Sequence, residues 1–188
     1  VRSGMRVASI PCGLMDDLLR VKAAQHDLDI ELVGIDKDQE SLKLARENAK
    51  EYGLSSSVQL REESAWALSN KTPYDIILSN GLNLYEPDHD RVTDLYRNFH
   101  NTLKKGGILI TSFLTPPPAL DKNSPWRNIN PVDALKQKAV LADALAAKWR
   151  SYRTEEETRK QMTDAGFKVL NVIYDHQHMF PTIIARKV

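Results

Sequence analysis

Two stretches near the start of the chain combine residue types that bind a nucleotide-like cofactor. In the first, an apolar run ends at Pro11-Cys12-Gly13 and leads into helix-forming residues; in the second, ELVGID, an apolar run ends on Asp36. A tight turn between a strand and a helix lets the backbone approach a ligand closely. An acidic residue about 20 positions later can then accept hydrogen bonds from both ribose hydroxyls. The alternatives are a turn without a ligand and an Asp36 that caps a helix or faces solvent.

Strands and helices are predicted to alternate around these two stretches. Apolar runs predict strands at residues 5–10, 30–35, 58–61, 74–79 and 108–113. Amphipathic spacing and end signals predict helices at residues 14–24, from Asp38 to before Gly53, and from Asp90 to Lys104-Lys105-Gly106-Gly107. This alternation is typical of a parallel sheet with helices on both faces.

The alternation changes after the fifth strand. Prolines at 116–118 exclude a helix or central strand there, and a loop at 119–130 precedes a helix predicted at 131–152. Thr154 opens a capping box for a last helix that ends at Gly166. Strands at 168–174 and 182–186 are too close in sequence for a crossover helix, so they form a hairpin. We therefore predict an α/β fold: a doubly wound, mostly parallel seven-stranded sheet with a C-terminal antiparallel hairpin.

The bulk composition is that of a single globular domain over residues 1–188. The net charge of +1, from 26 basic and 25 acidic residues, favours neither nucleic acid nor a membrane as partner. With one cysteine and no long apolar run, we expect a cytoplasmic location. Because the first predicted strand begins already at Met5, we expect the chain to be part of a longer protein.

Four stretches, taken in order, resemble the class I S-adenosylmethionine-dependent methyltransferases. IPCGL is similar to the family's glycine-rich first loop, and GIDKDQESLKLAREN to its second strand and helix with the ribose-binding acid. KKGGILITSF resembles the approach to its fifth strand, and MTDAGFKVLNV the approach to its sixth. The resemblance covers nearly the whole chain. It implies S-adenosylmethionine as cofactor and methyl transfer to an acceptor, which we expect to be a small molecule.

The first loop departs from the family pattern, which reads acid-x-Gly-x-Gly-x-Gly. Aligned on Gly13, the chain has Ser9 at the acidic position, Pro11 at the first glycine and Met15 at the third. The fixed φ of Pro11 can still hold a tight turn. Asp16 or Asp17, one turn later, could replace the lost carboxylate.

The resemblance also implies the other cofactor contacts. Ser64 takes the place of an adenine-binding Asp, Ala65 offers its backbone N–H, and Trp66 stacks or packs beside them. Residues after the fourth strand flank the methionine moiety. The full set of expected cofactor-binding residues is Ser9, Pro11, Cys12, Gly13, Asp36, Lys37, Ser64, Ala65, Trp66, Asn80 and Gly81.

The loop after Gly81 supplies the candidates for methyl transfer. Tyr85, Asn83 and Glu86 are the polar groups nearest the expected transfer point, where a Tyr or a carboxylate can act as general base or contact the sulfonium. The alternative is a polar loop that caps the following helix. The acceptor wall is expected in an insertion at 115–153, with Pro116–Pro118, Trp126 and Trp149 as candidate lining.

Two other functions fit parts of the pattern. An NAD(P)-dependent oxidoreductase also uses a strand, a turn, a helix and an acid, although the single glycine and the terminal hairpin disfavour it. A non-catalytic relative that has lost the cofactor would explain Ser9, Pro11 and Met15. No metal site is expected, since no histidine pair has ligand spacing on a helix, and Cys12 has no neighbouring base to make it a nucleophile.

Overall fold

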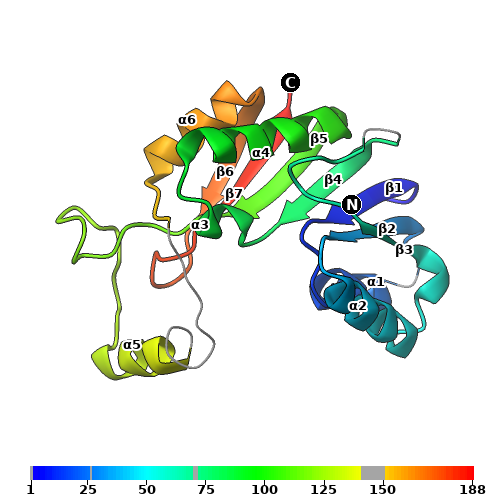
Figure 1. The fold of residues 1–188 in the computed structure, drawn as a ribbon, viewed down its shortest axis with the longest axis horizontal. Helices are drawn as coiled ribbons and strands as arrows, with labels where there is room; N and C mark the ends of the chain where they lie inside the picture. The colour runs from blue at the N-terminus through cyan, green and yellow to red at the C-terminus, as the bar shows by residue number, and fades with distance from the viewer. Residues whose placement is uncertain (1, 26, 70–71, 141–150) are drawn as a thin grey trace.

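A single sheet organises the chain in the computed structural model, which describes residues 2–25, 27–69, 72–140 and 151–188 (Figure 1). The strands are β1 (Met5–Ser9), β2 (Ile30–Asp36), β3 (Val58–Glu62), β4 (Tyr74–Ser79), β5 (Leu103–Ser112), β6 (Phe167–Ile173) and β7 (Thr182–Lys187). The helices are α1 (Asp16–Ala24), α2 (Gln39–Glu51), α3 (Leu82–Tyr85), α4 (His89–Thr102), α5 (Pro131–Lys138) and α6 (Glu155–Asp164). None of the described helices is long and apolar enough to cross a membrane.

The strand order of the seven-stranded sheet, β3-β2-β1-β4-β5-β7-β6, confirms the predicted fold class. β1 pairs in parallel with β2 and β4, and β7 is antiparallel to β5 and β6. The order reverses between β1 and β4, because β2 and β3 lie on one side of β1 and the later strands on the other. In open sheets of this kind, ligands bind at the carboxyl ends of the strands beside such a reversal.

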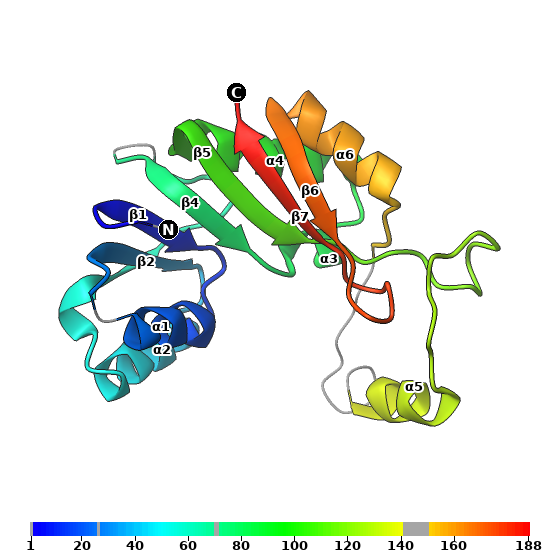
Figure 2. The ribbon, with the colours of Figure 1, turned by 180° about the vertical axis from the view of Figure 1, so that it is seen from behind.

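Helices cover both faces of the sheet, as predicted, but they cover different strands (Figures 1 and 2). α1 and α2 pack on β1 and β2 through a cluster that includes Leu32 and Ala45. α4 and α6 pack on the opposite face, through a cluster that includes Phe99 and Met162. α1 and α2 therefore cover the first strands from one side, and α4 and α6 cover the last strands from the other, where the core also includes Ala8 of β1 and Val33 of β2.

Along β5 and β7, buried residues alternate with partly buried ones. Leu109 and Ile183 lie in the same cluster as Phe99 and are 0% exposed, whereas Ile108, Ile110 and Ile184 are only partly buried. Figure 2 shows the second face of β5, β7 and β6 with no described helix in front of it. Successive residues of a strand point to opposite faces, so each of these strands has one dry side and one partly hydrated side.

The structure corrects the sequence-based prediction in two places around β4 and β5. The segment Lys104–Gly107, expected to end a helix, belongs to β5, because Leu103 is buried and already pairs with Tyr74 of β4. The residues after Gly81, expected as a loop, contain the short helix α3.

The helix predicted at 131–152 begins at Pro131 as expected, and residues 141–150 lie outside the described part of the chain. Its predicted end is wrong, since the chain from Ser151 to Arg153 is not helical. The N–H of Ser151 donates to Leu84 O at 3.2 Å, and the N–H of Arg153 donates to Leu114 O at 2.8 Å. These long-range bonds replace those that a helix would form with its own preceding turn.

Gly34 in β2 lets the first loop pack closely on the sheet. A Cβ at this position would lie 2.7 Å from Leu60 Cδ2 and 3.1 Å from both Cys12 Sγ and Met15 Sδ. Any larger residue would push these side chains apart and strain their packing. The glycine therefore allows Cys12 and Met15 to be buried directly against β2, which places the turn at the end of that strand.

Candidate functional site

The first loop is fixed against the end of β2 by hydrogen bonds. The N–H of Cys12 donates to Ile35 O at 2.9 Å, and the N–H of Gly13 donates to Asp36 Oδ2 at 3.2 Å. Gly13 has a φ of 48°, in the left-handed region, and a Cβ there would have nothing within 4 Å. Glycine adopts this backbone conformation without a steric penalty and leaves the space beside the loop open.

Asp36 is a buried carboxylate that the backbone holds in place. It is 9% exposed, and its Oδ1 accepts a hydrogen bond from the N–H of Asp38 at 3.1 Å. Each oxygen of an ionised carboxylate can accept two hydrogen bonds, so both oxygens retain capacity after the bonds from Gly13 and Asp38. Asp36 is thus oriented by the protein and still able to accept hydrogen bonds from a ligand.

Two neighbouring cavities meet at Pro11 and Asp36. The first-loop cavity, of about 560 Å³, is bordered also by Ser9, Cys12, Gly13 and Asn80. The Trp66 cavity, of about 390 Å³, is bordered also by Lys37, Ser64, Ala65 and Trp66. Both volumes lie within the range of small-molecule sites, about 300–1,000 Å³. The structure therefore brings together every residue expected to bind the cofactor except Gly81, which borders neither cavity.

Trp66 forms a fixed wall of its cavity. Its indole N–H donates to Arg91 O at 3.2 Å, and the Arg91 guanidinium lies 5.8 Å from the centroid of the ring. Ser64 Oγ accepts the backbone N–H of Trp66 at 3.3 Å. Trp66 is thereby packed onto α4, one of the two roles that the sequence left open for it.

Of the two acids that could replace the missing first-loop carboxylate, Asp17 is the less engaged. Asp16 accepts from the Tyr52 hydroxyl at 2.8 Å and pairs with Arg20 at 2.6 Å, and these partners lower the pKa of its carboxyl. Asp17 Oδ1 accepts the N–H of Leu18 at 2.8 Å. Both acids border the first-loop cavity.

Cys12 is the thiol at the site, and its surroundings make it a poor nucleophile. Burial, followed by the nearby Asp36 charge, raises the pKa of the Cys12 thiol to about 12. A thiol with such a pKa stays protonated at neutral pH and is a poor nucleophile. Within the described ranges, no group of three or more His, Cys, Asp and Glu side chains could hold a metal ion.

The structure does not gather the three residues expected to act in methyl transfer. Asn83 is 2% exposed, and its amide Nδ2 donates to the Tyr96 hydroxyl at 3.0 Å and to Ser112 O at 2.8 Å. Burial raises the pKa of Tyr96 to about 12, so its hydroxyl stays neutral. The amide nitrogen of Asn83 thus links α3 to α4 and β5, whereas its buried Oδ1 has no hydrogen-bond partner among the described residues, and the expected part of Asn83 in methyl transfer stays a prediction.

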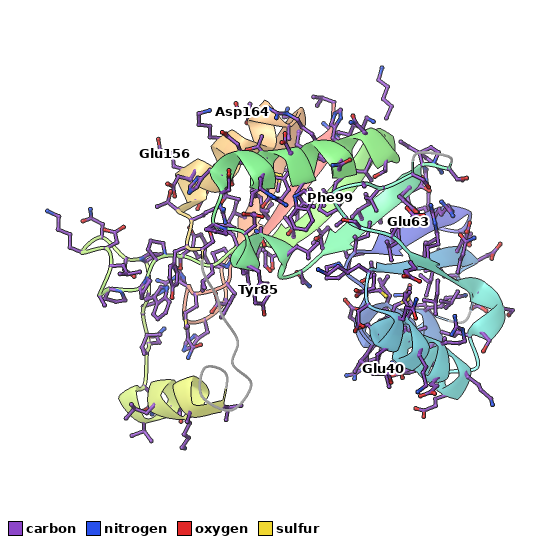
Figure 3. All side chains as sticks on the ribbon, viewed as in Figure 1. Glu40, Glu63, Tyr85, Phe99, Glu156 and Asp164 are labelled. Atoms are coloured by element: carbon purple, nitrogen blue, oxygen red, sulfur yellow. The ribbon has the colours of Figure 1, made fainter. Side chains whose placement is uncertain are left out.

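Tyr85 and Glu86 lie at the same edge of the sheet but in different surroundings. Tyr85 is 51% exposed and borders neither cavity; Figure 3 shows it at the carboxyl edge, beyond β4 and away from the α4 layer. Glu86 borders the Trp66 cavity, pairs with Arg91 at 3.0 Å and accepts the N–H of Asp88 at 3.1 Å. Its carboxylate is therefore part of the cavity wall.

Sequence reasoning missed some residues that border the Trp66 cavity, namely Glu63, Leu82 and Arg91. Glu63 directly precedes the expected adenine contact Ser64, so its position after β3 was an available signal. Arg91 lies within α4, where nothing local distinguishes it from a solvent-facing helix residue. It reaches the cavity because Trp66, in the segment after β3, packs on α4.

Only part of the expected acceptor wall lies among the described residues. The indole N–H of Trp126 donates to Thr115 Oγ1 at 2.9 Å and to Thr115 O at 3.1 Å, and Trp126 borders neither cavity. Trp149 lies outside the described residues. Trp126 thus braces the start of the 115–153 segment.

Comparisons with known proteins agree with this geometry. A family model described as a methyltransferase domain matches residues 2–171. Among solved structures, the chain is 45% identical to a possible exported protein from Bordetella parapertussis, with a TM-score of 0.87, over 100% of this chain and 63% of that one. It is 20% identical to an O-methyltransferase family 2 protein from Planctomyces limnophilus, with a TM-score of 0.73, over 99% of this chain and 52% of that one. It is 17% identical to a SAM-dependent methyltransferase from Methanosarcina mazei, with a TM-score of 0.71, over 100% of this chain and 94% of that one.

The assignment of the chain to a family rests on the match to the family model. Among curated proteins the sequence finds no match. The chain spans 63% and 52% of the length of the first two similar structures, and the two low-identity structures show the fold alone. The family match, however, extends over most of the chain and includes both cavities. The chain belongs to the methyltransferase-domain family of S-adenosylmethionine-dependent enzymes with a Rossmann-like fold.

Proposed function

We propose that the chain binds S-adenosylmethionine across the two cavities and transfers its methyl group to a small-molecule acceptor. Family membership implies this cofactor. The observation that carries the proposal is Asp36, an oriented, buried carboxylate with acceptor capacity left on both oxygens at the border of the two cavities. A ribose presents two adjacent hydroxyl donors, which such a carboxylate can bind.

The residues on either side of Asp36 fit the remaining parts of the cofactor. The Trp66 cavity would hold the adenine, with the Ser64 hydroxyl and the Ala65 backbone as polar partners. The first-loop cavity would hold the methionine moiety, with Asp17 as the carboxylate for its ammonium group. The open space beside the Gly13 backbone leaves room for the ligand.

Methyl transfer depends more on alignment than on a conspicuous catalytic group. The cofactor supplies a methyl group already activated by the sulfonium charge, so the protein chiefly contributes proximity and orientation, about 7–11 kcal/mol in favourable cases. A base is needed only when the acceptor must first lose a proton. For that role we propose Tyr85, whose side chain is exposed at the carboxyl edge, with Glu86 as the second candidate.

The class of acceptor is supported by two observations. The near-zero net charge gives the chain no general attraction for nucleic acid. The similar O-methyltransferase family 2 protein was solved in complex with apigenin, a small organic molecule. Incubation of the chain with a library of small molecules and S-adenosylmethionine labelled on its methyl group would identify the acceptor. The expected cytoplasmic location stays a prediction.

Calorimetric titration with S-adenosylmethionine, S-adenosylhomocysteine and NAD tests the proposed cofactor. We expect both adenosyl compounds to bind with a Kd below about 100 μM, a binding free energy of about −5.5 kcal/mol or better, and NAD to give no binding heat. Binding of NAD alone would instead support the oxidoreductase. Binding of none of the three would support a non-catalytic relative that has lost the cofactor through its altered first loop.

A further inference from the structure

Arg153 is a buried cation that the proposed methyl transfer does not use. It is 2% exposed, its Nη1 donates to Asn83 O at 2.8 Å, and its Nη2 donates to Glu86 O at 2.7 Å. Both acceptors are backbone carbonyls around the last turn of α3. The guanidinium therefore binds the C-terminal end of this short helix, where the backbone leaves carbonyls without intrahelical partners.

The backbone around Arg153 is tied to the same region. The N–H of Arg153 donates to Leu114 O just after β5, and the N–H of Ser151 donates to Leu84 O within α3, at 2.8 and 3.2 Å. Within α3, the buried amide of Asn83 donates to the Tyr96 hydroxyl and to Ser112 O. A helix of only four residues, Leu82–Tyr85, is thus held by hydrogen bonds to groups distant in sequence.

The position of α3 matters because it forms one wall of the Trp66 cavity. Leu82 at its start and Glu86 just after its end both border that cavity, as Asp36 and Ser64 do. A helix of one turn has little stability of its own, so its placement depends on its tertiary contacts. Arg153 supplies two charge-assisted hydrogen bonds to it, which are stronger than bonds between neutral groups.

We propose that Arg153 is a positioning residue that sets the affinity of the chain for its cofactor by holding α3 as the wall of the Trp66 cavity. This inference rests on the proposed function for its ligand. Arg153 does not itself border the cavity, and both of its side-chain hydrogen bonds go to backbone carbonyls of Asn83 and Glu86, so we place its effect on the cavity in how it holds α3. It also couples the end of the 115–153 segment to the cofactor site.

The chain offers a matched control in Arg6, a second buried arginine. Arg6 is 9% exposed and donates to Thr72 O and Gln59 Oε1, at 2.7 and 2.9 Å, and it borders neither cavity. It lies in β1 three residues before the carboxyl end of that strand. Replacing either arginine with methionine removes a buried guanidinium, but only Arg153→Met frees α3.

The experiment measures S-adenosylhomocysteine affinity by calorimetry and amide hydrogen exchange by mass spectrometry in wild type, Arg153→Met, Arg153→Lys and Arg6→Met. If α3 keeps its wall position only about a tenth of the time without Arg153, the apparent Kd rises about tenfold. We expect this rise in Arg153→Met, a smaller rise in Arg153→Lys, which retains one charged donor group, and a change within about twofold in Arg6→Met. Exchange of peptides over residues 82–86 should accelerate in Arg153→Met and not in Arg6→Met.

Equal affinities and equal exchange over residues 82–86 in Arg153→Met and Arg6→Met would overturn the inference. If Arg153→Met does not fold, the same comparison of affinity and exchange is made between Arg153→Lys and Arg6→Met. If the wild type binds no S-adenosylhomocysteine, the proposed function fails, and the exchange comparison alone then decides whether Arg153 holds α3.

Discussion

Replacing Asp36 with alanine should lower the affinity for S-adenosylhomocysteine at least about tenfold. The change removes two ribose hydrogen bonds to a charged acceptor, each worth about 1.5–3 kcal/mol, and about 1.4 kcal/mol corresponds to a factor of ten. It also removes the acceptor for the N–H of Gly13, which loosens the first loop over the neighbouring cavity. Calorimetric titration of the variant, with circular dichroism to confirm folding, measures the effect.

A neighbouring acid provides the control for this variant. Asp38 accepts the N–H groups of Glu40 and Ser41 at the start of α2 and borders neither cavity. Asp38→Ala should cost about 0.5–2 kcal/mol of stability through the lost helix cap, with affinity within about twofold of wild type. Wild-type affinity in a folded Asp36→Ala protein, or an equal loss in Asp38→Ala, would remove Asp36 from the site.

The second large effect is expected for Gly13→Val, which should abolish detectable S-adenosylhomocysteine binding. A valine side chain would extend into the open first-loop cavity, where a Cβ meets no atom within 4 Å, and would occupy the space of the ligand. The φ of 48° adds backbone strain of about 1–3 kcal/mol for a β-branched residue. Titration gives the affinity, and urea denaturation gives the loss of stability.

Gly53→Val separates the steric block of the ligand from the backbone strain. Gly53 follows α2, has a φ of 69° and an equally open Cβ position, and borders neither cavity. We expect a similar loss of stability in this variant together with normal binding. Normal binding in Gly13→Val would show instead that the ligand does not lie over the first turn.

Local sequence patterns predicted the strands of the sheet, and the family resemblance supplied most of the residues that border the two cavities. The carboxyl ends of parallel strands meet at one edge of the sheet, and the structure accordingly places Gly13, Asp36 and Ser64 around two adjoining cavities. For the polar residues after β4, the sequence did not indicate which side chains are buried, because burial there depends on the single helical turn of α3. Asn83 turned inward and Tyr85 outward, a difference set by Tyr96 and Ser112 far along the chain.

Arg91 and Arg153 were beyond sequence reasoning for a related reason. Each contributes to the Trp66 cavity only because another element packs against its own: Arg91 meets the residues after β3, and Arg153 meets α3. No spacing rule links positions that lie 25 and 70 residues apart in the chain.

The uneven covering of β5 and β7 has a consequence for how this sequence can diverge. A polar replacement at Leu109 or Ile183 would bury a group without a hydrogen-bond partner, at a cost of about 2–7 kcal/mol, which is large beside the total stability of about 5–15 kcal/mol of an ordinary domain. The same replacement at Ile110 or Ile184 would remain in contact with water. Tolerance to polar substitution should therefore alternate along these strands. Buried positions should accept few polar residues, and the partly exposed positions between them should accept many.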